Sequence, residues 1–349
     1  MPSTTPPETT PLPPHPALHT VTIVGAGAIG GWLGAQLAAA GCAVSVLARG
    51  HTLAALQAQG LQLVSGPSAQ PVLPPQPVVA VEQAQALGVQ DLVIIALKAP
   101  ALAEVAPQLQ PLLGPATVVL TAMNGVPWWF LQGGFGGPCA GRALASVDPG
   151  GLIAQAIPAA HVLGGVVHAS CSVDAPGVIH HHFGNGLIVG EPAGGTSARL
   201  QALVALLARA GLAATESAQI QKDIWYKLWG NMTVNPVSAL TGATTDRILD
   251  DELVRGFISA VMLEAKAIGE PLGIPIAQQP EDRHAVTRKL GAFRTSMLQD
   301  VDAAKPVELD ALVSAVRELG QLTGVATPCT DALLGLARLQ ARVRGLYPD

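Results

Sequence analysis

The stretch Val21-Thr22-Ile23-Val24-Gly25-Ala26-Gly27-Ala28-Ile29-Gly30 decides the fold of the first half of the chain. Its four apolar or β-branched residues predict a buried strand, and the small residues from Gly30 to Ala40 predict a helix. The glycines have the spacing G-x-G-x-x-G, which permits a tight turn, close approach of the backbone to a pyrophosphate and close helix–strand packing. A purely structural glycine turn is the weaker alternative. The residues that we predict to bind a dinucleotide are Gly25, Ala26, Gly27, Ala28, Ile29 and Gly30.

Short apolar runs alternate with helical runs over the rest of this half, which is the pattern of a parallel sheet with crossover helices. We therefore expect an α/β fold with a Rossmann-like doubly wound sheet. Pro67 to Pro77 is expected to form a surface loop, and the Gly- and Pro-rich segment 127–158 an elaborated loop beside the cofactor site. The further expected strands are residues 43–47, 91–97, 117–121, 162–169, 177–181 and 187–189, and the further expected helices are residues 53–59, 101–113 and 197–210.

The chain changes character after Gln219, where long helical runs with charged faces begin. These runs cover residues 246–268, 307–322 and 330–344. The expected organisation is a disordered Pro/Thr-rich tail over residues 1–19, a Rossmann domain over residues 20–218 and an all-helical domain over residues 219–349. Ligands in such an arrangement usually lie in the cleft between the two domains.

The composition excludes several classes of protein. With 349 residues and a net charge of −5, the chain has room for two domains but no basic surface for nucleic acid or an anionic membrane. The stretch from Val21 to Ala48 lacks charged residues, but its glycines favour a buried strand-turn-helix-strand over a transmembrane helix. No signal peptide is visible, and four scattered cysteines without a CxxC pair predict a reduced, cytoplasmic protein.

One run of residues, His180-His181-His182, could suggest a metal site. Adjacent residues of a strand point to opposite faces, and no further cluster of ligands accompanies the run. We therefore predict that the chain binds no metal.

The end of the second expected strand predicts which dinucleotide is bound. An NAD enzyme usually has an Asp or Glu there, on the ribose 2′-OH, whereas this chain has Leu47-Ala48-Arg49-Gly50-His51 and no acid nearby. A guanidinium can pair with a 2′-phosphate, so Arg49 favours NADP (NADPH), unless it is only a solvated loop charge. Lys98 and Asn124-Gly125 follow two further strands at the same edge of the sheet, where we expect them beside the ligands.

A second polar constellation lies in the helical half, within Ile224-Trp225-Tyr226-Lys227-Leu228-Trp229-Gly230-Asn231-Met232-Thr233-Val234-Asn235-Pro236. Lys227 and Asn231 are four residues apart and share one helical face, and Asn235 continues this face if the helix extends to Pro236. The proline disfavours helical geometry at Asn235. Taken alone, Lys227 is either a snorkelling surface lysine or a lysine held in a cleft for chemistry.

These blocks resemble the ketopantoate reductase (2-dehydropantoate 2-reductase) family over nearly all of the chain after the tail. The resemblance is carried by Gly25 to Gly30, the turn at Lys98, Asn124-Gly125, residues 225–236, Thr295 to Asp300, and Glu308 in Val307-Glu308-Leu309-Asp310. It implies that Lys227 is the general acid that protonates the carbonyl oxygen, and that Glu308 orients substrate and cofactor. It also implies that Asn124, Asn231, Asn235 and Ser296 hold the substrate, with Lys98 and Asn124 near the cofactor.

The resemblance changes the interpretation of Glu308, which would otherwise be an ordinary acid at a helix amino terminus beside Pro306. Asp300 and Asp310 belong to the same blocks, and we interpret both as structural caps or solvated charges. The segment 127–158 departs from the simplest members of the family. Because it is expected near the substrate entrance, it affects the identity of the substrate more than the reaction.

The main hypothesis is NADPH-dependent reduction of 2-dehydropantoate to (R)-pantoate, a step of pantothenate biosynthesis. An alternative is a related NADP-dependent enzyme that reduces another small 2-oxo acid or oxidises a 2-hydroxy acid. A third hypothesis is a nonenzymatic NADP-binding sensor, which would not need Lys227, Asn231, Asn235, Ser296 and Glu308 together. The expected partner is the small-molecule substrate, and the sequence leaves open whether the chain forms a homodimer.

Overall fold

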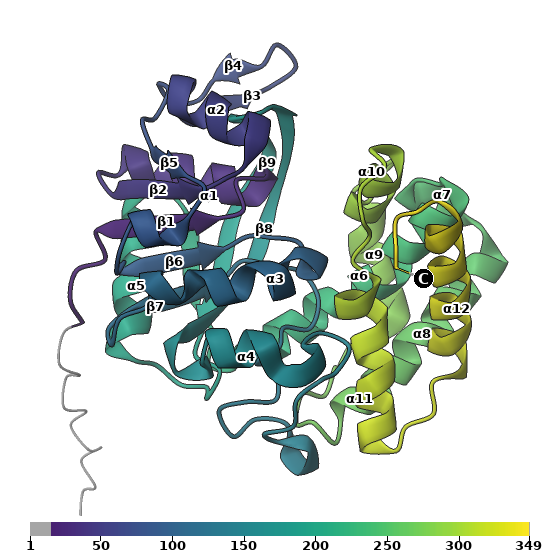
Figure 1. Cartoon of the computed structure of the whole chain (residues 1–349). Helices are drawn as coiled ribbons and strands as arrows, with labels where there is room; N and C mark the ends of the chain where they lie inside the picture. Colours follow the sequence, from purple (N-terminus) through teal and green to yellow (C-terminus); the bar gives the residue numbers. More distant parts are fainter. Residues whose placement is uncertain (1–14, 349) are drawn as a thin grey trace, which may run out of the picture.

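A mixed sheet forms the first half of the molecule in the computed structural model, which describes residues 15–348 (Figure 1). Most of the predicted tail, residues 1–14, therefore lies outside the described residues. Leu18 is buried just before the first strand. The strands are β1 (Thr20–Val24), β2 (Ala43–Leu47), β3 (Gln62–Ser65), β4 (Gln70–Pro71), β5 (Val79–Val81), β6 (Leu92–Ile95), β7 (Val118–Thr121), β8 (Val162–Ala175), β9 (Val178–Gly190) and β10 (Ala213–Glu216).

The centre of the sheet has the strand order of a dinucleotide-binding fold. Strands β5, β2, β1, β6, β7 and β8 lie side by side in that order, and every neighbouring pair is parallel. This is the Rossmann order 3-2-1-4-5-6, so the expected doubly wound sheet is confirmed. In the register, Val24 lies opposite Leu47 and Ile95, and Ile95 lies opposite Thr121. The turns that follow these strands therefore meet at one edge of the sheet.

The largest difference from the sequence prediction is at β8 and β9. The sequence predicts three short strands here, whereas the structure has one long antiparallel hairpin. Its outer half carries exposed polar residues, so the apolar pattern ends before the ladder of backbone hydrogen bonds does. The expected loop at residues 67–77 also contains the short strand β4, which pairs with β3.

Helices flank the sheet and make up the second half of the molecule. The first group is α1 (Ala28–Ala39), α2 (Gly50–Gln59), α3 (Ala99–Val105), α4 (Leu152–Ala156) and α5 (Ala198–Arg209). The second group is α6 (Ile220–Thr241), α7 (Thr245–Asp250), α8 (Glu252–Gly269), α9 (Pro280–Arg288), α10 (Ser296–Asp302), α11 (Ala315–Thr323) and α12 (Pro328–Val343). Short 3₁₀ turns cover residues 84–86, 106–112, 137–139, 149–151 and 159–161, and a π-helical turn covers residues 310–314.

Three expected helices depart from regular α-helix, two of them for a visible local reason. The helix expected at 101–113 ends as α3 at Val105 and continues as a 3₁₀ helix, because the ring and missing N–H of Pro107 disfavour the α-helical bond. The helix expected at 246–268 is divided at Asp251, whose carboxylate accepts the free N–H groups that begin α8. The helix expected at 307–322 begins with the π-helical turn. None of the helices within residues 15–348 combines the length and apolar character that a bilayer span requires.

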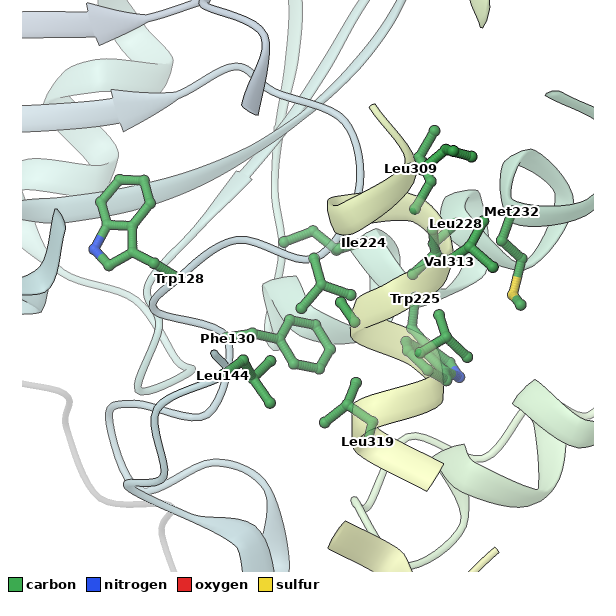
Figure 2. Close-up of a cluster of buried hydrophobic side chains, with 14 of the residues drawn as sticks. Trp128, Phe130, Leu144, Ile224, Trp225, Leu228, Met232, Leu309, Val313 and Leu319 are labelled. Carbon is green, nitrogen blue, oxygen red and sulfur yellow. The ribbon is translucent and has the colours of Figure 1, made fainter. Parts of the chain in front are cut away.

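Segment 127–158 joins the two halves through buried aromatic side chains. Its backbone is irregular, as expected, and its only α-helix among the described elements is α4. Trp129 and Phe130 are completely buried, and the ring of Phe130 lies 6.0 Å from that of Trp225 on α6. Figure 2 shows Phe130, Leu144 and Trp225 in this cluster of buried side chains, beside the helix that carries Val313 and Leu319. One hydrophobic core therefore extends from the sheet, through this segment, into the helical half.

Candidate active site

The glycine turn after β1 has the geometry that a dinucleotide requires. Gly25 has a φ of +99°, and a Cβ at Gly30 would lie 2.0 Å from the carbonyl oxygen of Gly25. Both positions therefore need glycine. A Cβ at Gly27, in contrast, would meet nothing within 4 Å, so the space beside this residue is free for a ligand. Helix α1 begins here with neither a side-chain cap nor an acid in its first turn, which leaves its N–H groups available to a pyrophosphate.

Arg49 lies at the same edge, directly after β2. Its side chain is 55% exposed and pairs at 3.1 Å with Glu104 of α3, which is 71% exposed. The sequence has no acid near Arg49, but the fold brings one from a distant helix. Such an exposed pair contributes little to stability, so Arg49 can exchange Glu104 for a phosphate. The residues present thus fit a nicotinamide dinucleotide with a 2′-phosphate.

Lys227 of α6 reaches across the junction to the sheet. Its Nζ donates a hydrogen bond of 2.9 Å to Oδ1 of Asn124, after β7, and one of 2.7 Å to the carbonyl oxygen of Val167 in β8. Burial lowers the pKa of Lys227 to about 8, although the charge of Glu308 acts in the opposite direction. The lysine is thus held in a cleft between the two halves, and the alternative of a snorkelling surface lysine does not describe it.

Glu308 belongs to the same cluster. It is 8% exposed, and its carboxylate accepts a 3.1 Å hydrogen bond from the backbone N–H of Ala99 at the start of α3. Burial raises the pKa of Glu308, while the charges of Lys98 and Lys227 lower it. The carboxylate therefore lies close enough to both lysines to interact with them electrostatically.

Lys98 and Asp300 form an ion pair that joins the turn after β6 to α10. The sequence interpretation of Asp300 as a cap or solvated charge is therefore wrong. Its side chain is largely buried, because α10 packs against α6 and the carboxylate meets Lys98. Asp310, in contrast, has a structural role, since its carboxylate accepts hydrogen bonds from Ser314 and Tyr347.

The Asn124-Gly125 turn is fixed against the helical half by a close backbone contact. Gly125 has a φ of +83°, and a Cβ there would lie 2.5 Å from the carbonyl oxygen of Ala311 in the π-helical turn. The N–H of Val126 donates to the same oxygen at 2.8 Å. π-Helical turns are often found at functional sites, and here the turn positions the residue that holds Lys227.

Asn231 and Asn235 continue the face of α6 that carries Lys227, because the helix extends past Pro236 to Thr241. Asn231 lines the narrow cavity that contains Lys227 and Asn124, and also a neighbouring cavity of about 210 Å³. Asn235 lines the larger cavity, and its amide lies 3.5 Å from the hydroxyl of Ser296, at the start of α10. Asn231 and Asn235 therefore line neighbouring cavities, and Ser296 lies beside Asn235.

Arg283 of α9 lines the larger cavity, and the sequence interpretation missed it. Its guanidinium lies over Gly230, where a Cβ would be 2.6 Å from its Nε. The signal in the sequence is Gly230 itself, since a glycine inside a helix costs about 1 kcal/mol relative to alanine unless a neighbour needs the space.

The histidine run lies in the β8–β9 hairpin. His180 pairs with Asp174 at 2.9 Å, and its ring stacks on that of His182 at 4.6 Å, as expected for residues two apart on a strand. Across residues 15–348, His, Cys, Asp and Glu side chains do not gather in groups of three that could hold a metal ion.

The cluster around Lys227 can bind an anionic carbonyl compound and give it a proton. An ammonium with a pKa near neutrality transfers a proton efficiently, and amide groups beside it can orient a polar substrate. The glycine turn lies at the carboxyl edge of the same sheet. The arrangement therefore suits a reaction in which a carbonyl group gains a hydride and a proton.

Comparison with known proteins identifies the family. Residues 21–127 match the model of ketopantoate reductase PanE/ApbA, and residues 219–341 match the model of its C-terminal part. The chain is 47% identical over 328 residues to a 2-dehydropantoate 2-reductase of Mesorhizobium japonicum, covering 94% of this chain and 99% of the relative.

Two solved structures are similar over nearly the whole chain. A candidate ketopantoate reductase from Ralstonia solanacearum MolK2 is 59% identical, with a TM-score of 0.89 and coverage of 95% of this chain and 100% of that chain. A 2-dehydropantoate 2-reductase from Methylococcus capsulatus is 27% identical, with a TM-score of 0.77 and coverage of 93% and 97%. The chain is therefore an oxidoreductase that belongs to the ketopantoate reductase family.

Proposed function

We propose that this protein reduces 2-dehydropantoate to (R)-pantoate with NADPH, as a step of pantothenate biosynthesis. The observation that carries the proposal is the position of Lys227, whose Nζ is held by Asn124 and Val167 in the cleft between the sheet and α6. The 47% identity to a curated 2-dehydropantoate 2-reductase supports the choice of substrate.

NADPH would supply the hydride. The glycine turn from Gly25 to Gly30 would hold its pyrophosphate, and Arg49 would hold its 2′-phosphate after release from Glu104. Lys98 and Asn124 lie at the same edge of the sheet and would border the nicotinamide half.

Lys227 protonates the carbonyl oxygen of the substrate. As the carbonyl carbon gains a hydride, its oxygen gains negative charge, which the ammonium first neutralises and then protonates. A positioned general acid typically contributes about 10²- to 10⁴-fold in rate, or about 3–5 kcal/mol. Asn124 keeps the ammonium in place through its 2.9 Å hydrogen bond.

The remaining residues orient the substrate. Glu308 sits where its charge favours the protonated form of Lys227, and it also fixes the turn at Ala99. Asn231, Asn235 and Ser296 lie along the cleft beyond Lys227 and would hydrogen-bond the hydroxyl and carboxylate groups of the substrate.

The test is the oxidation of NADPH by the purified protein with a panel of 2-oxo acids that includes 2-dehydropantoate. We expect 2-dehydropantoate to have the highest kcat/KM, and K227M to lose most of kcat while it still binds NADPH. K222M is the matched control, because Lys222 is an exposed lysine of the same helix. Rapid turnover of another acid without turnover of 2-dehydropantoate would refute the proposed substrate.

A second candidate function is reduction of a different 2-oxo acid. The observation that favours it is the cavity of about 210 Å³ beside Asn231, which is lined by apolar side chains that could take a larger substituent. Those side chains are Val234, Val286, Leu290 and Phe293. The same panel of acids distinguishes the two candidates. A cytoplasmic location stays a prediction from the sequence, and the formation of a homodimer stays open.

A further inference from the structure

Arg283 is a partly buried cation that forms no ion pair with a carboxylate of the described chain. Its Nε is buried without a hydrogen-bond partner, whereas Arg288, five residues later on α9, pairs with Asp250. Its guanidinium contacts the ring of Tyr226, whose centre lies 5.7 Å from the guanidinium carbon. A cation–π contact contributes about 0.5–1 kcal/mol at exposed sites and leaves the N–H groups of the fork unused. The unpaired charge and the buried Nε of this side chain therefore need a further explanation.

The location of Arg283 indicates what it could bind. It lines the cavity of about 210 Å³ together with Asn231 and Asn235, and Asn231 also borders the cavity around Lys227. The charge of Arg283 is close enough to lower the pKa of Lys227, in addition to burial. In a 2-oxo acid the carboxylate is bonded directly to the carbonyl carbon. If the carbonyl oxygen of the substrate faces Lys227, the carboxylate lies a few ångströms away. We place it on the side of the larger cavity, which Asn231 also lines.

The glycine at position 230 indicates that the side chain of Arg283 has a definite position. The guanidinium occupies the volume that a side chain at residue 230 would fill, with three of its atoms between 2.6 and 2.9 Å from the position of a Cβ. The sequence thus accepts a glycine in the middle of α6, at a cost of about 1 kcal/mol, and the space accommodates a cation that faces the cleft.

We infer that Arg283 binds the carboxylate of the 2-oxo acid and is the residue that selects anionic substrates. This inference rests on the proposed function for the identity of the reacting group. The planar fork of arginine donates two parallel hydrogen bonds to a carboxylate, which fixes the orientation of the acid relative to Lys227. Arg283 is thus a substrate-binding residue that acts beside the amide groups of Asn231 and Asn235.

The first experiment compares a 2-oxo acid with its uncharged methyl ester, using the wild-type enzyme, R283Q and R288Q. A charge-assisted hydrogen bond contributes enough that R283Q should raise KM for the acid about 10- to 100-fold and leave KM for the ester within about twofold. R288Q is the matched control on the same helix, outside the cavity, and should behave as wild type with both compounds. Equal changes for acid and ester, or no change for either, would overturn the inference.

A second variant keeps the test independent of the folding of R283Q. G230A retains the charge but places a methyl group where the guanidinium lies, so Arg283 must leave its position. The side chain is flexible, so we expect a folded protein with a raised KM for the acid and an unchanged KM for the ester. An unchanged KM for the acid in G230A would contradict the assigned position of Arg283.

A binding measurement separates this inference from the proposed function. Oxamate is an unreactive mimic of a 2-oxo acid, and its affinity can be measured by calorimetry on the NADPH complex without any turnover. Weaker oxamate binding by R283Q than by R288Q supports the inference, even if no 2-oxo acid of the panel is reduced. If 2-oxo acids are reduced but R283Q binds oxamate as tightly as wild type, the inference fails and the proposed function stands.

Discussion

The protonation state of Lys227 should control the pH dependence of both directions of the reaction. Its pKa is about 8, chiefly because of burial, and reduction needs the ammonium form. About 90% of the lysine is then protonated at pH 7 and about 10% at pH 9, so kcat/KM for reduction should fall about tenfold between these values. Oxidation of the 2-hydroxy acid needs the neutral amine, so its kcat/KM should rise over the same range.

Two substitutions should move this pH dependence in opposite directions. Glu308 raises the pKa of Lys227 and Arg283 lowers it, so E308Q should move the midpoint to lower pH and R283Q to higher pH. His168 is the control. Burial and the charges of Lys227 and Arg283 lower its pKa from 6.5, so it is already neutral where Lys227 titrates. H168N should therefore leave the midpoint unchanged.

The assay is the absorbance of NADPH at saturating cofactor, with kcat/KM for the 2-oxo acid measured from pH 6 to about pH 10. The same profile is recorded with NADPH that carries deuterium at the transferred position, because an isotope effect identifies the pH range in which the chemical step limits the rate. A profile that stays flat through pH 9 while the isotope effect is present would refute the role of Lys227 as the acid. Shifts of the same sign in E308Q and R283Q would refute the electrostatic explanation.

Three further predictions test other parts of the structure. R49Q should raise KM for NADPH about 10- to 100-fold and hardly affect KM for NADH. E104Q should lower KM for NADPH, because it frees Arg49 from its 3.1 Å ion pair. Steady-state kinetics with both cofactors measures these changes. K227M should lower kcat about 10²- to 10⁴-fold with an unchanged fluorescence titration by NADPH. F130A should lower the free energy of unfolding by about 3–5 kcal/mol, because Phe130 is completely buried. L152A, in the same segment, alters a half-exposed side chain and should change the free energy of unfolding little. Urea denaturation measures both values.

Local rules were sufficient for the part of the site that follows the parallel strands. Because Val24, Leu47, Ile95 and Thr121 are in register, the turns after them had to meet at one edge, and the sequence correctly groups the glycine turn with Lys98 and Asn124. The helical spacing likewise places Asn231 on the face of Lys227. Both predictions depend on periodicities that the backbone itself imposes.

The contacts between elements that are far apart in the chain could not be predicted in this way. Asp300 has the appearance of a solvated helix charge, and Glu104 is 55 residues from Arg49. Each finds its partner only because α10 packs against α6, or because α3 passes near the end of β2. Helical periodicity predicts that a charge lies on one face of its own helix, but not what that face meets. Such pairs become visible only when the packing of the two halves is known.

Local rules also failed to predict Arg283. This residue gives the helical half a second role in addition to carrying Lys227. A reductase that only supplied a proton would accept any carbonyl compound that enters the cleft, because a proton donor does not distinguish an acid from an ester. A second fixed cation, held over Gly230 and facing the amides of Asn231 and Asn235, adds that discrimination. Its charge also lowers the pKa of Lys227, against the effect of Glu308. When a carboxylate neutralises Arg283, this effect weakens, so binding of an anionic substrate should itself favour the protonated lysine that the reduction requires.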